Sequence, residues 1–308
     1  MRATVAVIGA GNVGATLTQR LAERDLVDLA LVDVVEGLAE GKALDLQQAG
    51  PVQGYDTRIV GGTDYALIDG AEVVVVTSGL ARKPGMSRDD LVQANARIIA
   101  QVAEAVREHA PQAILVVVTN PLDAMTQLAL QVTGWPRHRV VGMAGVLDTA
   151  RYRSFLAAAL GVSVASVQAH VLGGHGDTMV PLTGMTTVAG VPVAKLLPPD
   201  RLESIVQRTR DGGAEVVRLL KTGSAYYAPS AAAAQMVEAI LLDRRVVLPA
   251  AAMLEGEYGL RGVVMGVPVK LGSQGILEVL EVELTEPERA AFLRSADAAR
   301  ELLRVMAG

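Results

Sequence analysis

The stretch that decides the fold is residues 4–14, which read TVAVIGAGNVG. Its first five residues are apolar or β-branched, as in a strand that is buried on both faces. The pattern G-x-G-x-x-G follows at once, and a helical pattern with Leu17 and Leu21 comes next. The first glycine permits a tight turn, the second lets a pyrophosphate approach the backbone, and the third lets the helix pack on the strand. The free N–H groups of that helix would face the phosphates, so the stretch predicts a dinucleotide-binding βαβ unit.

An acidic residue follows at the distance that such a unit requires. The second apolar run, 29–32, ends in Asp33, about 20 residues beyond the glycines. A carboxylate there accepts hydrogen bonds from the ribose hydroxyls of adenosine and repels a 2′-phosphate, so we predict NAD rather than NADP. A plain βαβ turn is the alternative interpretation. The predicted cofactor contacts are Asp33 and the turn residues Gly9, Ala10, Gly11, Asn12, Val13 and Gly14.

Apolar strands and helices alternate through the first half of the chain. Such alternation predicts a parallel sheet with right-handed crossovers, the doubly wound Rossmann arrangement of an α/β protein. Ligands bind beyond the carboxyl ends of such strands, so the loops that begin at Thr77 and Thr119 are candidate ligand loops. The further strands are expected at 58–60, 72–76 and 113–118, and the helices at 36–49 and 89–109.

The pattern changes after Gly142, and strands no longer alternate regularly with helices. We therefore expect a Rossmann NAD-binding domain at 1–143, followed by an α+β substrate and catalytic domain at 144–308. Thr285 and Glu288 form a capping box that predicts the start of the last helix. The other elements expected in this half are helices at 146–160, 200–220 and 226–242, a strand at 166–172, a hairpin at 188–193, and an antiparallel sheet from 245–257, 262–271 and 276–284.

Composition narrows the class of protein. The 308-residue chain is 51% hydrophobic and 20% charged, with a net charge of -5 and no cysteine. The negative charge argues against a nucleic-acid-binding surface, and the missing thiols exclude disulfides, thiolate metal sites and cysteine nucleophiles. No stretch resembles a signal peptide or approaches the roughly 20 apolar residues of a membrane span. A cytoplasmic protein without a metal or a membrane partner is expected.

One histidine has unusual surroundings. His175 lies in the run GGHGD at 173–177, where three glycines let the backbone adopt unusual dihedral angles. Imidazole is the side chain best suited to moving a proton near neutral pH, so His175 is a candidate acid or base. The alternative is a glycine-rich turn with an incidental histidine. The other three histidines, His109, His138 and His170, are interpreted as structural.

Five separated motifs give the whole chain a specific resemblance. They are 9–14 with Asp33, 81–88 (ARKPGMSR), 119–123 (TNPLD), 147–151 (LDTAR) and 174–177 (GHGD). With them the chain resembles the lactate/malate dehydrogenase family, and LKTGSAYYAP at 220–229 is similar to the malate dehydrogenases of its lactate-dehydrogenase-like subgroup. The resemblance implies an NAD-dependent oxidoreductase of the tricarboxylic acid cycle that interconverts (S)-malate and oxaloacetate. It also implies a homo-oligomer, for which a tetramer is expected before a dimer.

The resemblance assigns catalytic roles that the chemistry makes sense of. His175 is implied as the base that takes the hydroxyl proton of a 2-hydroxy acid, and as the acid in the reverse direction. Asp148 is implied to bond the far ring nitrogen, fix the tautomer and stabilise the imidazolium. By itself Asp148 would be interpreted as a helix-surface carboxylate. Arg88 would polarise the substrate carbonyl from a loop at about 79–90, whose glycines and proline are typical of a mobile lid that expels water.

Substrate recognition is implied at further positions. Arg151 would bind the C1 carboxylate in a bidentate manner. Arg82 is implied to pair with the second carboxylate of malate or oxaloacetate, where lactate enzymes carry glutamine, and an arginine left unpaired in a closed site would reject pyruvate. A solvated basic loop is the alternative for both Arg82 and Arg88. The remaining assignments are Asn120 to the substrate oxygen, Ser224 to the substrate pocket, and Asn95, Val118, Thr119 and Asn120 to the cofactor.

Three other functions remain open at this point. A dehydrogenase for lactate or another 2-hydroxy acid is the nearest, and Arg82 argues against it. An NAD-dependent glycoside hydrolase resembles such an enzyme in fold and cofactor, but that family uses a metal site, commonly with cysteine, and this chain has none. A regulatory protein that holds NAD without turnover would have no need of His175, Asp148, Arg88 and Arg151.

Overall fold

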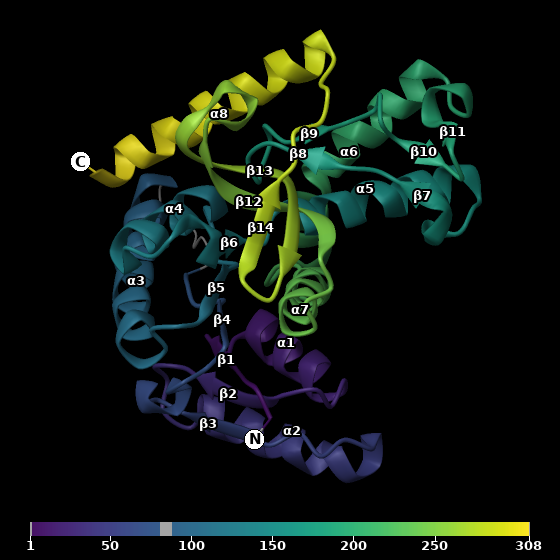
Figure 1. Ribbon diagram of the computed structural model, residues 1–308. Coiled ribbons are helices and arrows are strands. Elements are labelled where there is room, and N and C mark those ends of the chain that lie inside the picture. Colours follow the sequence, from purple (N-terminus) through teal and green to yellow (C-terminus); the bar gives the residue numbers. More distant parts are fainter. Residues whose placement is uncertain (1, 81–87, 308) are drawn as a thin grey trace.

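The computed structural model describes residues 2–80 and 88–307 of the chain. A single nine-stranded sheet runs through the molecule, with helices on both faces of its parallel part (Figure 1). The elements of the first half are β1 (Thr4–Ile8), α1 (Asn12–Ala22), β2 (Asp28–Val32), α2 (Leu38–Gln53), β3 (Ile59–Gly62), the 3₁₀ turn η1 (Tyr65–Ile68), β4 (Val73–Val76), α3 (Arg88–His109), β5 (Ile114–Val117), α4 (Leu122–Thr133), η2 (Arg137–Arg139) and β6 (Val140–Gly142).

The first six strands form the predicted doubly wound sheet. They lie in the order β3-β2-β1-β4-β5-β6, and every neighbouring pair is parallel. The order reverses between β1 and β4, because the chain crosses from one side of β1 to the other. In such a sheet the crevice at the carboxyl ends of the strands, beside this switch point, is where ligands bind. The prediction of a Rossmann arrangement is confirmed.

The alternation of side chains along the strands explains why these residues form a sheet covered on both faces. Val5 and Val7 of β1 belong to one apolar cluster, whereas Ala6 and Ile8 belong to the cluster on the other face. Successive side chains of a strand point to opposite faces. A strand whose residues are all apolar can therefore be buried only between two layers of helices.

The second half of the chain contains short strands, four α-helices and a long hairpin. Its elements are α5 (Gly145–Leu160), η3 (Val164–Ser166), β7 (Val167–Gln168), β8 (Val171–Leu172), β9 (Val180–Pro181), β10 (Thr187–Val188), β11 (Val191–Pro192), η4 (Val193–Lys195), α6 (Pro199–Leu220), α7 (Tyr227–Leu241), β12 (Val246–Glu255), η5 (Glu257–Gly259), β13 (Arg261–Gly272), β14 (Gly275–Val279) and α8 (Glu286–Ala307).

Several expectations for this half are confirmed. The hairpin is formed by β10 and β11, and its two turn residues, Ala189 and Gly190, have φ of 47° and 83°. Positive φ at both positions is the geometry of the tight turns that suit a twisted hairpin. The last helix begins at Glu286, where the Glu288 carboxylate accepts hydrogen bonds from the backbone N–H and the hydroxyl of Thr285.

Two expectations need correction. The antiparallel strands β12, β13 and β14 do not form a sheet of their own, because β12 pairs with β6 and so extends the parallel sheet. That join is close: a Cβ added at Gly142 would lie 2.8 Å from the Cβ of its partner Ala251. The single strand expected at 166–172 is instead two short strands, since β7 pairs with β10 and β8 pairs with β9.

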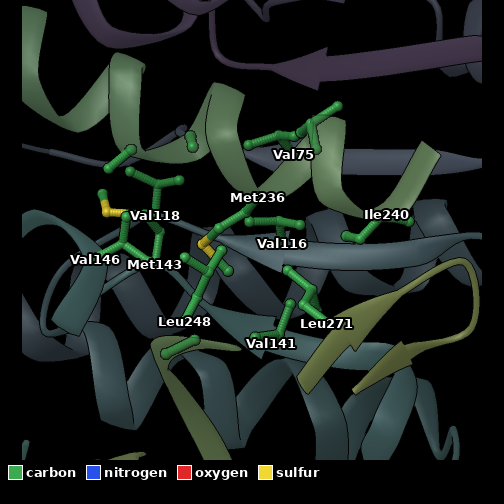
Figure 2. Packing of buried hydrophobic residues seen from close by; sticks show 14 of the residues in the cluster. Val75, Val116, Val118, Val141, Met143, Val146, Met236, Ile240, Leu248 and Leu271 are labelled. Atoms are coloured by element: carbon green, nitrogen blue, oxygen red, sulfur yellow. The ribbon is translucent and has the colours of Figure 1, made fainter. Parts of the chain in front are cut away.

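The alanine-rich helix α7 returns from the second half of the chain to cover the parallel sheet. It packs beside α1, and Met236 and Ile240 point toward Val75 and Val116 of the sheet (Figure 2). Its alanines are small enough to let the helix lie close to its neighbours. Across the residues described, no helix has the length and apolar character needed to cross a membrane, and no group of three potential metal ligands occurs.

Candidate active site

The structure brings His175 and Asp148 together. His175 lies in the loop between β8 and β9, and Asp148 lies in the first turn of α5. The ring nitrogen Nδ1 of His175 is 2.7 Å from Oδ2 of Asp148, whose side chain is 2% exposed. With Nδ1–H donating to the carboxylate, the other ring nitrogen, Nε2, is left as the one that can take or give a proton.

The electrostatics of this pair favour a protonated imidazole. Burial by itself lowers the pKa of His175, but the charge of Asp148, its hydrogen bond, and the charge of Asp123 together outweigh burial and raise the pKa above its ordinary value. Arg151 acts in the opposite direction. His175 therefore keeps its proton up to a higher pH than a free imidazole does.

Arg151 lies beside this pair on the same helix. Its Nη1 donates to Oδ1 of Asp148 at 3.2 Å, so that Asp148 contacts both cationic groups. The side chain of Arg151 runs along α6 at Gly212, where an added Cβ would lie 3.1 Å from its Cδ. Glycine at 212 thus leaves the space that this long side chain occupies. The result is a guanidinium next to an acid–base histidine, which is an arrangement suited to a substrate with a carboxylate near its reacting carbon.

The glycine-rich turn has the shape of a phosphate cradle. Gly9 has a φ of 106°, and a Cβ added at Gly14 would lie only 1.8 Å from the carbonyl oxygen of Gly9. Gly11 stands at the N-cap of α1, and nothing lies within 4 Å of the position its Cβ would take. The turn therefore leaves open space in front of the helix N-terminus, where backbone N–H groups and the helix dipole favour the pyrophosphate of a dinucleotide.

Asp33 comes directly after β2 and is bonded to the same turn. Its Oδ2 accepts a hydrogen bond from the N–H of Ala10 at 2.6 Å, and its Oδ1 accepts one from Val35 at 3.0 Å. Each oxygen of a carboxylate can accept a second hydrogen bond. Lys42, which we did not predict, holds the same turn from the other side, since its Nζ donates to the carbonyl of Ala10 at 2.5 Å. The only sequence signal for Lys42 is its position about one turn into the helix that follows Asp33.

The loops after β4 and β5 are bonded to each other and to this turn. The Thr77 hydroxyl donates to the carbonyl of Gly9 at 2.9 Å, and the Thr119 hydroxyl donates to that of Ser78 at 2.6 Å. Asn95 of α3 is 1% exposed and bonds to both loops: its Oδ1 accepts from Leu80 N–H at 2.7 Å and its Nδ2 donates to the Asn120 carbonyl at 2.7 Å. Asn95 thus joins the two loops by hydrogen bonds from their buried side.

The other predicted positions are distributed differently. Val118 is buried after β5, Asn120 is exposed at the start of α4, and Ser224 is exposed between α6 and α7, with no described contact that brings it to His175. Arg82 lies outside the described residues. Arg88 begins α3, but its side chain also lies outside them.

Two residues that sequence reasoning missed hold the histidine loop. The N–H of His175 donates to Oδ2 of Asp123 on α4 at 2.8 Å, and the N–H of Gly174 donates to Oγ of Ser295 on α8 at 2.8 Å. Asp123 ends the TNPLD motif, which was the only signal available for it. Ser295 lies in an ordinary helical stretch 120 positions beyond His175 and carries no signal at all.

Two other histidines have surroundings of their own. Nδ1 of His109 pairs with Asp69 at 2.7 Å near the end of α3. Burial, and then the charge of Arg153, lower the pKa of His170. None of these groups is among those that bond the His175 loop.

Comparison with known proteins agrees with this geometry. Residues 3–142 match the family domain described as "lactate/malate dehydrogenase, NAD binding domain", and residues 145–306 match its alpha/beta C-terminal domain. The malate dehydrogenase of Thermomicrobium roseum is 57% identical over 306 residues, which is 99% of each chain, and that of Rhodopirellula baltica is 54% identical over 100% of this chain and 98% of its own.

Solved structures give the same result. The malate dehydrogenase of Salinibacter ruber superimposes with a TM-score of 0.94 at 48% identity, covering 98% of this chain and 97% of its own. The lactate dehydrogenase of Cryptosporidium parvum, solved with lactic acid and nicotinamide adenine dinucleotide, gives a TM-score of 0.97 at 39% identity, covering 100% and 99%. A sheet with the doubly wound order, a phosphate cradle with its acid, and full-length identity above one half together place this chain in the lactate/malate dehydrogenase family, and its first half is the NAD-binding domain of that family.

Proposed function

We propose that this protein is an NAD-dependent malate dehydrogenase that interconverts (S)-malate and oxaloacetate. The observation that carries the proposal is the buried His175–Asp148 pair with Arg151 beside it. A proton carrier and a carboxylate-binding cation occur side by side, as the oxidation of a 2-hydroxy acid requires. The two relatives named above at 54% and 57% identity are both malate dehydrogenases, which supports the same substrate class here.

The chain's own residues account for the proton and for substrate orientation. When bound, NAD supplies the hydride acceptor. Nε2 of His175 takes the hydroxyl proton of malate, while Asp148 on Nδ1 keeps the ring in the required tautomer and stabilises the imidazolium that forms. Arg151 holds the C1 carboxylate, so that the carbon that loses hydride has one orientation. In the reverse direction the imidazolium of His175 protonates the alkoxide as it forms.

The choice among 2-hydroxy acids rests on Arg82. The resemblance to the family assigns this residue to the second carboxylate of malate or oxaloacetate. A lactate dehydrogenase is the second candidate, favoured by the likeness to the Cryptosporidium parvum enzyme at 39% identity. The higher identities belong to malate dehydrogenases and support the first candidate.

One assay tests the proposal. Loss of NADH absorbance is followed with oxaloacetate, with pyruvate, and with no acceptor. We expect fast loss with oxaloacetate and at least about 100-fold lower kcat/KM with pyruvate, because a site built for two carboxylates leaves a cation unpaired when one is missing. No loss with oxaloacetate would contradict the proposed function, and equal rates would favour a broader 2-oxo acid reductase.

Asp33 is expected to set the preference for NAD. Asp33→Asn keeps an acceptor for the N–H of Ala10 but removes the charge that bonds the ribose hydroxyls and repels a 2′-phosphate. We expect kcat/KM for NADH to fall about 10- to 100-fold, the value of one or two hydrogen bonds to a charged group, and the NADPH/NADH ratio to rise. Asp28→Asn, at the other end of β2, is the matched control and should leave the ratio unchanged. An unaltered ratio in Asp33→Asn would show that another residue selects the cofactor.

The wider setting is proposed on the same basis. We propose that residues 1–143 and 144–308 are the two functional domains, that the protein acts in the cytoplasm in the tricarboxylic acid cycle, and that it assembles as a homotetramer or homodimer. Light scattering on the purified protein distinguishes these assemblies from a monomer of 32.1 kDa.

A further inference from the structure

A second buried carboxylate lies next to His175, and the reaction described above does not use it. Asp123, in the first turn of α4, is 7% exposed. Its Oδ2 accepts the hydrogen bond from the backbone N–H of His175, whereas its Oδ1 is fully buried and has no hydrogen-bond partner among the described residues. An unsatisfied buried carboxylate oxygen is costly, so its presence calls for a physical reason.

The contact belongs to a set of tethers that hold the histidine loop from several directions. Gly173 exchanges hydrogen bonds with Gly266 of β13, at 2.9 and 3.0 Å. Gly174 donates to Ser295 of α8, and the Ser295 hydroxyl in turn donates to that of Thr178 at 2.9 Å. His175 donates to Asp123 of α4. The backbone on the N-terminal side of the imidazole is therefore fixed residue by residue.

The loop's sequence fits this close approach. A Cβ added at Gly174 would lie 3.1 Å from Oδ2 of Asp123 and 3.3 Å from Oγ of Ser295. Any larger residue would push both tethers away. The glycine before the histidine thus has a definite role, which is to let a carboxylate and a hydroxyl reach two successive N–H groups.

A tether alone does not require a charge. Ser295 performs the same task one residue earlier with a neutral hydroxyl, and an asparagine at 123 would also offer an acceptor. What a carboxylate adds is a negative charge near the imidazole. The charged groups that face His175 among the described residues are Asp148 and Arg151 on α5 and Asp123 on α4, and the charge of Asp123 is one of those that favour the imidazolium.

We propose that Asp123 is a positioning residue that tethers the histidine loop and, through its buried charge, stabilises the protonated form of His175. The inference rests on the proposed function, in which the imidazolium of His175 is the proton donor to oxaloacetate. It adds a second carboxylate to the pair with Asp148: Asp123 accepts a hydrogen bond from the backbone N–H of His175 and acts on the ring through its charge alone.

The charge of Asp123 is itself conditional on pH. Burial raises the pKa of Asp123 to about 6. The hydrogen bond from the His175 backbone and the charge of the His175 ring act in the opposite direction. The folded-state pKa lies above the ordinary value of 3.8, so the ionised form disfavours folding; this cost develops as the pH rises from 3.8 to about 6 and is fully present at pH 8. Asp123→Asn is therefore expected to unfold at the same temperature as the wild type or at a higher one at pH 8. A loss of activity in this variant is then not a loss of fold.

The deciding experiment measures the pKa of His175 directly. Histidine labelled with ¹³C in the ring is incorporated, the His175 resonance is assigned from its absence in His175→Asn, and the four histidines are titrated by NMR. In Asp123→Asn we expect the midpoint for His175 to fall by about half to one pH unit, as expected for removal of one buried charge. The alkaline limb of kcat for oxaloacetate reduction should move down by the same amount, which lowers the rate above that limb about 3- to 10-fold.

Two controls separate charge from tethering. Ser295→Ala removes a neutral tether and should lower kcat while leaving the His175 midpoint in place. Asp69→Asn removes an exposed carboxylate beside His109 and should leave both the His175 midpoint and kcat unchanged. If the His175 midpoint in Asp123→Asn coincides with the wild type, or falls equally in Ser295→Ala, the proposal is wrong. The NMR titration needs no substrate, so failure of the proposed function, seen as no turnover of oxaloacetate, is a distinct outcome.

Discussion

Replacing His175 by asparagine is expected to lower kcat for oxaloacetate reduction by about 10²- to 10⁴-fold, the usual contribution of a general acid. Asparagine has no proton to give near neutral pH, so the alkoxide that forms must take its proton from water. Arg151 remains in place to hold the carboxylate. We therefore expect KM for oxaloacetate to change much less than kcat.

The pH dependence of the wild type follows from the same residue. Burial lowers the pKa of His175, but the charges of Asp148 and Asp123 raise it by more than burial lowers it. The net pKa therefore lies above the ordinary value. Oxaloacetate reduction needs the protonated ring and should fall as the pH rises through that pKa, whereas malate oxidation needs the neutral ring and should rise there. Both limbs should vanish in His175→Asn.

The matched control is His109→Gln on α3. His109 is partly exposed and pairs with Asp69, and neither residue is bonded to the groups that hold His175. The kcat of His109→Gln is expected to stay within about twofold of the wild-type value, because substitutions at the surface usually have small effects. If His175→Asn kept more than a tenth of the wild-type kcat, another group would be the proton donor.

Replacing Arg82 by glutamine is expected to change the ratio of kcat/KM for oxaloacetate to that for pyruvate by about 10³-fold or more. If Arg82 pairs with the second carboxylate, as proposed, pyruvate leaves its guanidinium unpaired in the wild type, which costs several kcal/mol. In the variant that cation is gone, so the penalty on pyruvate disappears while oxaloacetate loses its ion pair. The two effects act in the same direction on the ratio.

Steady-state kinetics with both substrates measure this change. Lys83→Gln is the matched control, since it removes one positive charge from the adjacent position. Its substrate ratio is expected to change by less than about threefold, because a general loss of positive charge affects both anions alike. An unchanged ratio in Arg82→Gln would refute the assignment and return the lactate and broader 2-oxo acid alternatives to equal standing.

The sequence was sufficient for the parts of the molecule that depend on local pattern. The strands of the doubly wound sheet are mostly apolar runs, and the turn at 9–14 carries glycines, of which Gly9 and Gly14 stand where a Cβ has no room. Asp33 could be found because its spacing from the glycines follows from one βαβ unit. Such features need only a few turns of chain to be expressed.

The second half of the chain was harder to predict because its short strands pair across long distances. Nothing in residues 245–284 shows that β12 will lie against β6, a join that depends on the small side chains at Gly142 and Ala251 meeting in space. The strand expected at 166–172 also divides between two small sheets, since partners in β9 and β10 decide its pairing.

The candidate site divides in the same way. The sequence by itself determined the Rossmann sheet, the phosphate turn with Asp33, and a histidine in a glycine-rich loop. Only the tertiary structure decided that Asp148, 27 residues away, would bond its ring, and that Asp123 and Ser295 would bond its loop. The reason is physical: a local period specifies a helix or a strand, whereas a buried polar group is paired with whichever residue the packing of distant elements brings within 3 Å.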